Sequence, residues 1–297
     1  MLNRRSLFAA FAAAALSTPF FASGALAASS TPVIRVGINP GGQAEIMEVV
    51  KKNAEKLGLQ IKVFEFSDYI APNVALDTGD IDINSFQHQP YLDRQIKDRH
   101  YKIESVAKTI ISPLVFFTNK GYKSFKDIPN GSKIAIPNDA TNEGRALLIL
   151  QNAGYIKLRP GSGLQATPLD IVSNPKKLKF VEIEAPQLPR ALPDVAAAAV
   201  NGTYARPAGL SIAKQGVLVE SAKGSAYANV LVVRTADKNK PWVKTFIKAY
   251  HQPNVKAFIE KRFGDSTFPA CSLSLSFLSV FFEPGISGLF FSALRQM

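Results

Sequence analysis

Short apolar runs alternate with stretches of helical periodicity along most of the chain. The run VIRVGI (33–38) is rich in β-branched residues and predicts a strand, after which Ile46, Val49 and Val50 recur at helical spacing. The segment LQIKVFEF predicts the next strand, and a short helix, a glycine turn and a brief strand lead to the run INSFQHQPYLDR. This strand–helix alternation predicts an α/β fold built on a mainly parallel sheet.

A second unit with the same alternation begins near Tyr122. It contains the strand-and-turn segment SKIAIPND, the helical segment TNEGRALLILQNAG and the strand-like segments LKFVEIEA, VAAAAVNGTYA and ANVLVVRT. Two helical patterns follow, and the first has Val243, Phe246 and Tyr250 on one face. Ligands of parallel α/β sheets bind beyond the carboxyl ends of the strands, so polar residues that follow a strand are the candidate site.

The residues at these positions supply amides, aromatic rings and one guanidinium. The run INSFQHQPYLDR sets His88 between two glutamines, close to Phe86. Arg145 lies in the first turn of a predicted helix, where a guanidinium and free backbone N–H groups can hold a carboxylate. From the residues alone a structural reading stays open for each candidate. Arg145 could lie on an exposed helix face, His88 could make a structural hydrogen bond, and Phe86 could belong to the core. Asn201 could belong to a turn and Asn229 to a strand end.

Composition argues against several classes of site. The 297 residues are 46% hydrophobic and 20% charged, as in an ordinary globular protein, and the formal net charge is +12. The basic residues are dispersed without arginine-rich runs, which indicates solvated surfaces and predicts no nucleic-acid partner. A single cysteine, Cys271, and three scattered histidines predict neither a disulfide framework nor a metal site. Nucleophile-elbow, zinc-protease, phosphate-loop and dinucleotide motifs do not occur, so nothing nominates a reaction or a cofactor.

Both ends of the chain differ from its middle. Residues 1–27 combine a basic start, an apolar run and the small-residue end Ala25-Leu26-Ala27, which predicts a cleaved secretory signal peptide. The signal fits export by either the general secretion pathway or the twin-arginine pathway. Residues 266–297 form an atypical apolar tail, whose apolar run is too short to cross a membrane.

Four ordered motifs carry a resemblance to a known family. GDIDINSFQHQPYLD, IAIPNDATNEGRALLILQNAG, FVEIEAPQLPRAL and AAVNGTYA resemble the methionine-binding NlpA/MetQ family of substrate-binding proteins, over about residues 33–270. The resemblance implies a periplasmic-binding-protein fold, in which two α/β lobes joined by two crossovers close over a ligand in the cleft between them. Lobe 1 is expected to comprise residues 28–120 and 231–265, and lobe 2 residues 121–230.

The resemblance also implies roles for the candidate residues. Tyr69, Phe86 and His88 would line an aromatic slot for a thioether side chain, where sulfur–aromatic contacts are individually modest. Arg145 would bind the ligand carboxylate. Side-chain amides would hydrogen-bond the ammonium and carboxylate ends of the ligand: Asn142, Asn201 and Asn229. A zwitterion buried between lobes needs a partner for each charge once water is excluded.

The implied function is transport. We expect a monomeric, non-enzymatic receptor that captures methionine in the periplasm and delivers it to an ABC permease–ATPase complex. Two features depart from the family. The segment GALAASS has no cysteine at the cleavage site, which predicts a freely soluble periplasmic protein without a lipid anchor. The family usually ends shortly after a motif like FPA (268–270), so the residues beyond it look like a frameshift or a lineage-specific extension.

Three alternatives stay open. The same fold could bind D-methionine, a methionine-containing dipeptide or another lipophilic amino acid, which a ligand panel would separate. A secreted enzyme could use His88 and Asp68 as acid and base, and turnover assays would reveal it. An adhesin or membrane-surface protein could act through the basic charge and the apolar tail, and would bind anionic vesicles in a salt-sensitive way.

Overall fold

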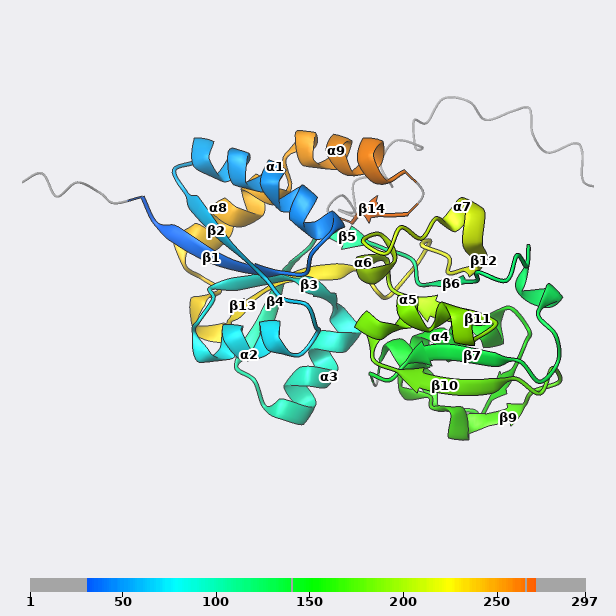
Figure 1. Ribbon diagram of the computed structural model, residues 1–297. Coiled ribbons are helices and arrows are strands. Elements are labelled where there is room, and N and C mark those ends of the chain that lie inside the picture. The colour runs from blue at the N-terminus through cyan, green and yellow to red at the C-terminus, as the bar shows by residue number, and fades with distance from the viewer. Residues whose placement is uncertain (1–30, 140, 265, 271–297) are drawn as a thin grey trace, which may run out of the picture. The chain divides into compact units, whose positions relative to one another are not determined.

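Two five-stranded sheets organise the part of the chain described by the computed structural model, residues 31–139, 141–264 and 266–270 (Figure 1). The expected signal peptide, residues 1–27, lies outside the described residues, and so does the expected tail from residue 271 onward. Helices pack on both faces of each sheet, which confirms the predicted α/β class.

The first sheet has the strand order β2-β1-β3-β13-β4, in which β1 pairs parallel with β2 and β3, and β13 pairs antiparallel with β3 and β4. In Figure 1, α1, α8 and α9 lie over one face of this sheet, and α2 and α3 lie over the other. Its elements are β1 (Val33–Ile38), α1 (Gly42–Lys56), β2 (Gln60–Glu65), α2 (Ala71–Thr78), β3 (Ile83–His88), α3 (Gln89–Arg99), β4 (Ile103–Lys108), β13 (Asn229–Arg234), α8 (Pro241–Tyr250) and α9 (Pro253–Phe263).

Burial on both faces explains the apolar character of the strands. Along β13, Leu231 and Val233 join the core that includes α1, α8 and α9, whereas Val230 and Val232 join the core that includes α2 and α3. Successive side chains of a strand point to opposite faces, so a strand covered on both sides is apolar throughout. This is why ANVLVVRT shows no polar alternation.

The second sheet has the strand order β10-β7-β11-β6-β12, with β10, β7 and β11 parallel and β6 antiparallel to both of its neighbours. Its elements are β6 (Val115–Phe117), β7 (Lys133–Pro137), α4 (Asn142–Asn152), β10 (Lys179–Ile183), α5 (Leu188–Ala191), β11 (Ala197–Val200), α6 (Gly202–Ala205), α7 (Ile212–Gln215) and β12 (Gly216–Val219). Two small sheets complete the fold: β5 (Ile110–Ile111) with β14 (Phe268–Pro269), and β8 (Lys157–Leu158) with β9 (Ile171–Ser173). Short 3-10 helices occur at Phe125–Asp127, Gly163–Gln165, Pro168–Asp170, Ala185–Gln187, Leu192–Asp194 and Thr235–Asp237.

The chain passes between the two sheets through residues 112–114 and again through residues 220–228, which gives the two predicted crossovers. The strand pairings differ by a few residues from the lobe boundaries expected after residues 120 and 230. Strand β6 pairs in the second sheet, β13 already begins at Asn229 in the first, and β14 pairs with β5, so the first residues of the expected tail take part in the fold. The division into lobes stays a prediction.

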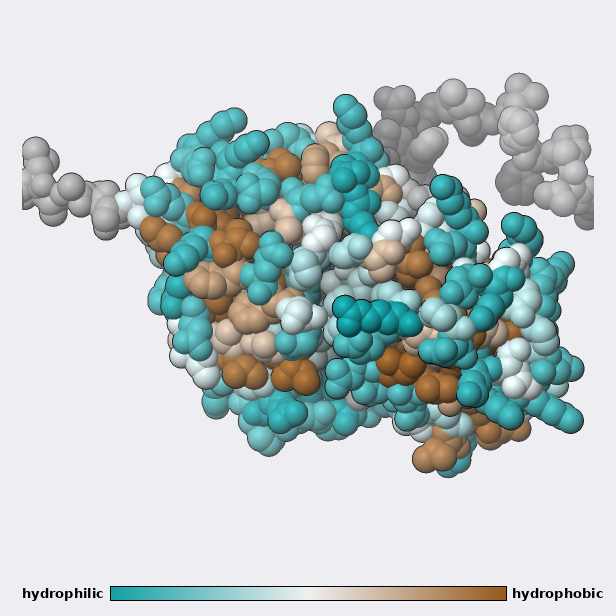
Figure 2. Space-filling model, viewed as in Figure 1, coloured by the Kyte–Doolittle hydropathy of each residue, from teal (hydrophilic) through white to brown (hydrophobic). Residues whose placement is uncertain are grey.

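The surface seen in Figure 2 carries separate apolar patches with hydrophilic side chains between them. The most exposed apolar side chains lie next to and within β9, where Leu169 is 87% and Val172 61% exposed. None of the helices within the described ranges combines the length and the hydrophobicity that crossing a bilayer requires.

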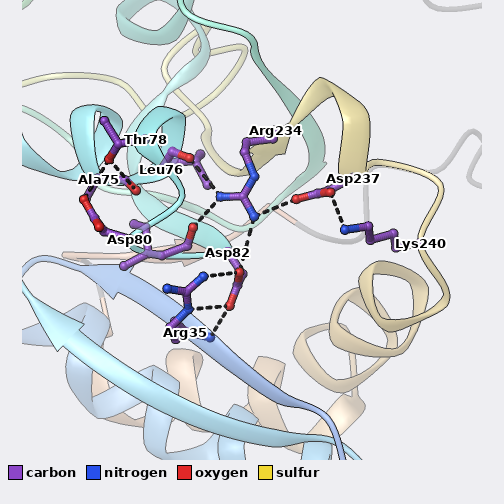
Figure 3. Close-up of polar contacts among 10 residues, drawn as sticks. Arg35, Ala75, Leu76, Thr78, Asp80, Asp82, Arg234, Asp237 and Lys240 are labelled. Atoms are coloured by element: carbon purple, nitrogen blue, oxygen red, sulfur yellow. Dashed lines mark hydrogen bonds and ion pairs between the residues drawn. The ribbon is translucent and has the colours of Figure 1, made fainter.

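An ion-pair network lies at the amino ends of the parallel strands in the first sheet (Figure 3). Arg35 binds the Asp82 carboxylate with two nitrogens, at 3.0 and 2.8 Å. Arg234 reaches the same carboxylate at 3.3 Å and donates to the carbonyls of Leu76 and Ile81 at 2.9 and 2.6 Å. These carbonyls belong to the last turn of α2 and the loop after it, so Arg234 adds a donor to the end of α2, where the N–H of Gly79 also donates to Leu76.

Replacing Arg234 by methionine is expected to lower the free energy of unfolding by about 2–3 kcal/mol, because it leaves the Ile81 carbonyl without a donor and removes the ion pairs of Arg234 with Asp82 and Asp237. Urea denaturation measures the change. Lys256→Met is the matched control, since Lys256 makes one exposed ion pair with Glu260 at 3.9 Å, and its loss should cost less than about 0.5 kcal/mol. Equal losses in the two variants would contradict this account of the network.

Candidate ligand-binding site

One cavity lies where strands of both sheets end. β3, β7 and β11 are parallel strands whose carboxyl ends lead to this cavity, and β13, which runs antiparallel to β3, begins beside it. The cavity has a volume of about 30 Å³. All seven residues expected from the sequence line it: Tyr69, Phe86, His88, Asn142, Arg145, Asn201 and Asn229. The structure therefore brings together side chains that lie as far as 160 positions apart in the sequence.

The hydrogen bonds of His88 determine which of its ring nitrogens carries the proton. His88 is the N-cap of α3, and its Nδ1 accepts the backbone N–H of Tyr91 at 3.2 Å. A backbone N–H can only donate, so the proton must lie on Nε2, which donates to Oδ1 of Asn142 at 3.2 Å. Both ring nitrogens of His88 therefore have partners within the protein.

The asparagines continue this chain of hydrogen bonds. Asn142 donates its amide N–H groups to the Asp139 carboxylate at 2.9 and 3.0 Å, so its Oδ1 is left to accept from His88 and Asn201. Asn201 uses its Nδ2 for this bond, at 3.0 Å. Its Oδ1 is buried and has no hydrogen-bond partner among the described residues. The cavity thus contains an acceptor, Oδ1 of Asn201, which is oriented by the amide of Asn142 and, through it, by the Asp139 carboxylate.

Arg145 supplies the positive charge of the cavity. Its Nε donates to Oε1 of Glu220 at 2.9 Å, and its Nη2 contacts Oε2 of Glu220 at 2.5 Å and the carbonyl of Ser112 at 3.0 Å. The guanidinium also lies 4.2 Å from the centre of the Tyr227 ring. No hydrogen bond from Nη1 occurs within the described residues, so the N–H donors of this nitrogen are unused among them.

Aromatic rings form the apolar part of the wall. The Tyr69 ring lies 6.0 Å from Phe86 and 5.0 Å from Tyr204, and the Phe86 ring lies 6.1 Å from Tyr91. The hydroxyl of Tyr91 donates to the carbonyl of Tyr69 at 2.8 Å, which fixes two of these rings relative to one another. Asn229 donates to the carbonyl of Phe86 at 3.1 Å and so holds the start of β13 against the end of β3.

Burial changes the ionisation of this site. Desolvation, with a further contribution from the positive charge of Arg145, lowers the pKa of His88 from 6.5 to about 3, so His88 is neutral at physiological pH. Desolvation likewise raises the pKa values of Tyr69, Tyr91 and Tyr227. Next to Asn142 in α4, burial and a neighbouring carboxyl group, Glu182, raise the pKa of Glu143 to about 7.

We expect His88 to make the protein less stable in acid. Its folded pKa lies below its unfolded value, so its contribution to stability is present above pH 6.5 and is lost as the pH falls toward 3. Between pH 7 and pH 4 the loss should be about 3 kcal/mol, and His88→Asn should remove that part of the slope. Urea denaturation at several pH values measures it. The control is His100→Asn, since His100 is exposed at the end of α3. Parallel stability curves for His88→Asn and the wild type would refute the assignment.

Several residues of the site were not predicted from the sequence. Glu220 and Tyr227 lie in the second crossover, and Ser112 lies in the first. Neither crossover has a periodic pattern, so no sequence signal pointed to these residues. Asp68, which the sequence offered as an acid or base beside His88, instead caps α2 by accepting the N–H groups of residues 70 and 71. No group of three or more His, Cys, Asp or Glu side chains that could hold a metal ion occurs in the described part of the chain.

The chain is similar to proteins whose names record methionine binding. The D-methionine-binding lipoprotein MetQ of Salmonella typhimurium is 50% identical over 234 residues, which is 78% of this chain and 86% of that protein. A structure of a nutrient binding protein from Burkholderia cenocepacia bound to methionine is 53% identical, with a TM-score of 0.77 over 80% of this chain and 99% of that one. An ABC transporter, periplasmic substrate-binding protein from Coxiella burnetii is 46% identical, with a TM-score of 0.76 over 80% of this chain and 100% of that one. These structures confirm the predicted periplasmic-binding-protein fold.

The prediction of a freely soluble protein without a lipid anchor is contradicted. It rested on a single local feature, the absence of a cysteine from GALAASS, a segment that lies outside the described residues. The Salmonella relative, at 50% identity, is named a lipoprotein. A short stretch beside a cleavage site is weaker evidence on anchoring than similarity along most of the chain, and we withdraw the prediction.

The match to a family model covers both sheets and the cavity. A model described as NlpA lipoprotein matches residues 34–271, a range that includes every residue lining the cavity and all but the first residue of β1. The family expected from four short motifs is thereby confirmed: the chain belongs to the NlpA lipoprotein family.

Proposed function

We propose that this chain is the substrate-binding protein of an ABC importer, and that it captures methionine in the cavity between β3, α4, β11 and β13. One observation carries the proposal. A guanidinium with free donors, an unpaired amide oxygen and a group of aromatic rings face the same enclosed space. A buried amino acid needs these three features, because its carboxylate, its ammonium and its side chain must each find a partner.

The polar ends of the ligand would bind on the Arg145 side of the cavity. The carboxylate would accept hydrogen bonds from Nη1 of Arg145, and the ammonium would donate to Oδ1 of Asn201. Asn229 has one amide N–H and its oxygen left after donating to Phe86, so it can bind either end. Neutral His88 would keep its ring against the ligand without adding charge.

The thioether side chain would extend toward the aromatic rings. Tyr69 and Phe86 offer ring faces and edges, where sulfur makes favourable contacts of about 0.3–1.5 kcal/mol. A cavity of about 30 Å³ holds little more than one or two water molecules. Entry of an amino acid therefore requires the walls to move apart, and the two crossovers are the natural hinges of that motion. The hydrogen bond from Tyr204 to the carbonyl of Ser67, 3.2 Å long, would break when they separate.

The first test identifies the ligand. Small molecules released by denaturing the purified protein are analysed by mass spectrometry, and calorimetry then compares L-methionine, D-methionine, methionine-containing dipeptides and leucine. Methionine among the released molecules, or binding at micromolar or lower concentration, is the expected result. Selective binding of the D isomer or of a dipeptide would keep the receptor function and change its substrate. A folded protein that binds none of these would overturn the proposal.

We expect a monomer that presents bound methionine to a permease–ATPase complex and catalyses no reaction on it. Light scattering of the purified protein with and without methionine measures the oligomeric state. A methionine-dependent rise in ATP hydrolysis, measured when the receptor is added to a reconstituted methionine importer, would support the transport role.

A further inference from the structure

Arg145 is the only charged side chain among the described residues that line the cavity, yet most of its hydrogen bonds go elsewhere. Two of its three nitrogens are bonded to Glu220 and Ser112. The ion pair with Glu220 is almost fully enclosed, since the side chains are 3% and 10% exposed. An enclosed ion pair is weakly screened by solvent, so Glu220 acts strongly on any charge that approaches Arg145.

Glu220 also fixes the position of Arg145. Its backbone N–H donates to the carbonyl of Leu114 at 3.1 Å, and the N–H of Leu114 donates to its Oε2 at 3.0 Å. Leu114 and Ser112 belong to the first crossover, whereas Glu220 begins the second. The Tyr227 ring, also in the second crossover, covers the guanidinium at 4.2 Å. Contacts from both crossovers therefore hold Arg145 in place and leave its third nitrogen, Nη1, without a hydrogen bond among the described residues.

We propose that Glu220 sets the charge selectivity of the cavity, so that a net-neutral α-amino acid is preferred to a monoanionic carboxylic acid with the same side chain. This inference rests on the proposed function and assigns a positioning and specificity role to a residue outside the cavity wall. Glu220 repels an incoming carboxylate and thereby offsets part of the attraction by Arg145. Glu220 attracts the ammonium of the same ligand. For a zwitterion, the repulsion of its carboxylate and the attraction of its ammonium therefore nearly cancel.

The other groups around the cavity do not supply this balance. His88 uses both ring nitrogens within the protein in its neutral form. Asp139 accepts hydrogen bonds from the side-chain amide and the backbone N–H of Asn142, and among the described residues it makes no ion pair with Arg145. Without Glu220, Arg145 would be an uncompensated positive charge and would favour any anion of suitable shape.

The test compares three ligands that have the same side chain but differ in net charge. These are L-methionine, 4-(methylthio)butanoate, which lacks the ammonium, and L-methioninamide, which lacks the carboxylate. Calorimetry, direct or by competition, gives their affinities for the wild type and for Glu220→Gln. The variant is expected to improve binding of the anion relative to methionine about tenfold, and to weaken binding of the cation relative to methionine by a similar factor.

The two affinity ratios, anion to methionine and cation to methionine, should change in opposite directions. This is the decisive result, because a loosened cavity would weaken the binding of all three ligands together. Glu104→Gln is the matched control, since Glu104 pairs with Lys238 in an exposed ion pair of β4, and both ratios should stay at the wild-type values. Glu220→Asp keeps the charge and should hold both ratios within about threefold of the wild type. It provides the test if Glu220→Gln does not fold, and a tenfold shift in Glu220→Asp would overturn the proposal.

Failure of this inference is distinguishable from failure of the proposed function. A wild-type protein that binds methionine, together with a Glu220→Gln variant whose two ratios are unchanged or move in the same direction, overturns the charge selectivity alone. A wild-type protein that binds none of the three ligands overturns both. Opposite shifts in Glu220→Gln, with unchanged ratios in Glu104→Gln, support the assignment.

Discussion

Replacing Arg145 by alanine is expected to weaken methionine binding at least about 100-fold, because the ligand carboxylate would then be buried without a charged donor. The substitution should also lower stability, since it leaves Glu220, whose side chain is 10% exposed, without its ion-pair partner. Calorimetry measures the affinity, and circular dichroism at the same temperature shows whether the variant is folded.

A matched arginine separates this effect from a general loss of charge or packing. Arg35 in β1 binds the carboxylate of Asp82, which precedes β3 of the same sheet, with two nitrogens at 3.0 and 2.8 Å, so it makes the same kind of ion pair as Arg145. It does not line the cavity. Arg35→Ala should therefore leave affinity within about twofold. A folded Arg145→Ala variant that binds methionine as tightly as Arg35→Ala would remove Arg145 from the site.

Replacing Gly144 by alanine is expected to cost about 3 kcal/mol of stability. A Cβ atom at this position would lie 2.3 Å from the carbonyl oxygen of Leu164 and 3.0 Å from the backbone nitrogen of Ala166. Backbone atoms cannot rotate away as a side chain can, so the first turn of α4 must shift. That turn carries Asn142 and Arg145, and methionine affinity should fall with stability. Thermal and urea denaturation, followed by calorimetry, measure both changes.

The control for this prediction is a glycine whose added methyl group meets a movable side chain. At Gly37 in β1 the nearest atom would be Cδ1 of Ile81, at 2.5 Å, which lies at the end of a flexible side chain. Gly37→Ala should cost about 1 kcal/mol and leave methionine affinity unchanged. If Gly144→Ala is no more destabilised than Gly37→Ala, the close approach of α4 to residues 163–166 is not the constraint described here.

Local patterns in the sequence predicted most of the elements. Helix α3, Gln89–Arg99, begins after a histidine cap and carries proline in its first turn, and both features are visible in the sequence. Five of the seven candidate side chains were also visible as polar residues at strand ends or in the first turn of a helix: His88, Asn142, Arg145, Asn201 and Asn229. Their position follows from a general rule about parallel sheets. Their assignment to methionine came from family resemblance instead, and their roles remain a proposal.

Pairing between distant segments was not predictable in the same way. Strand β6 has only three residues, Val115–Phe117, and its antiparallel pairing with β11 depends on tertiary contacts that no local period records. Glu220 looked like an ordinary charged residue after a strand, because its partner Arg145 is 75 positions away. A buried ion pair is recognisable only when both of its members are placed, so the charge balance of the cavity required the structure.

The most direct measurement of the central claim is a crystal structure of the protein grown with selenomethionine as the ligand. The protein's own methionines contain sulfur, so the selenium of a bound ligand would give the strongest anomalous signal. We predict one selenium peak inside the cavity, against the rings of Tyr69 and Phe86, with the ligand carboxylate on Arg145. A selenium peak elsewhere, with this cavity free of ligand, would contradict the account.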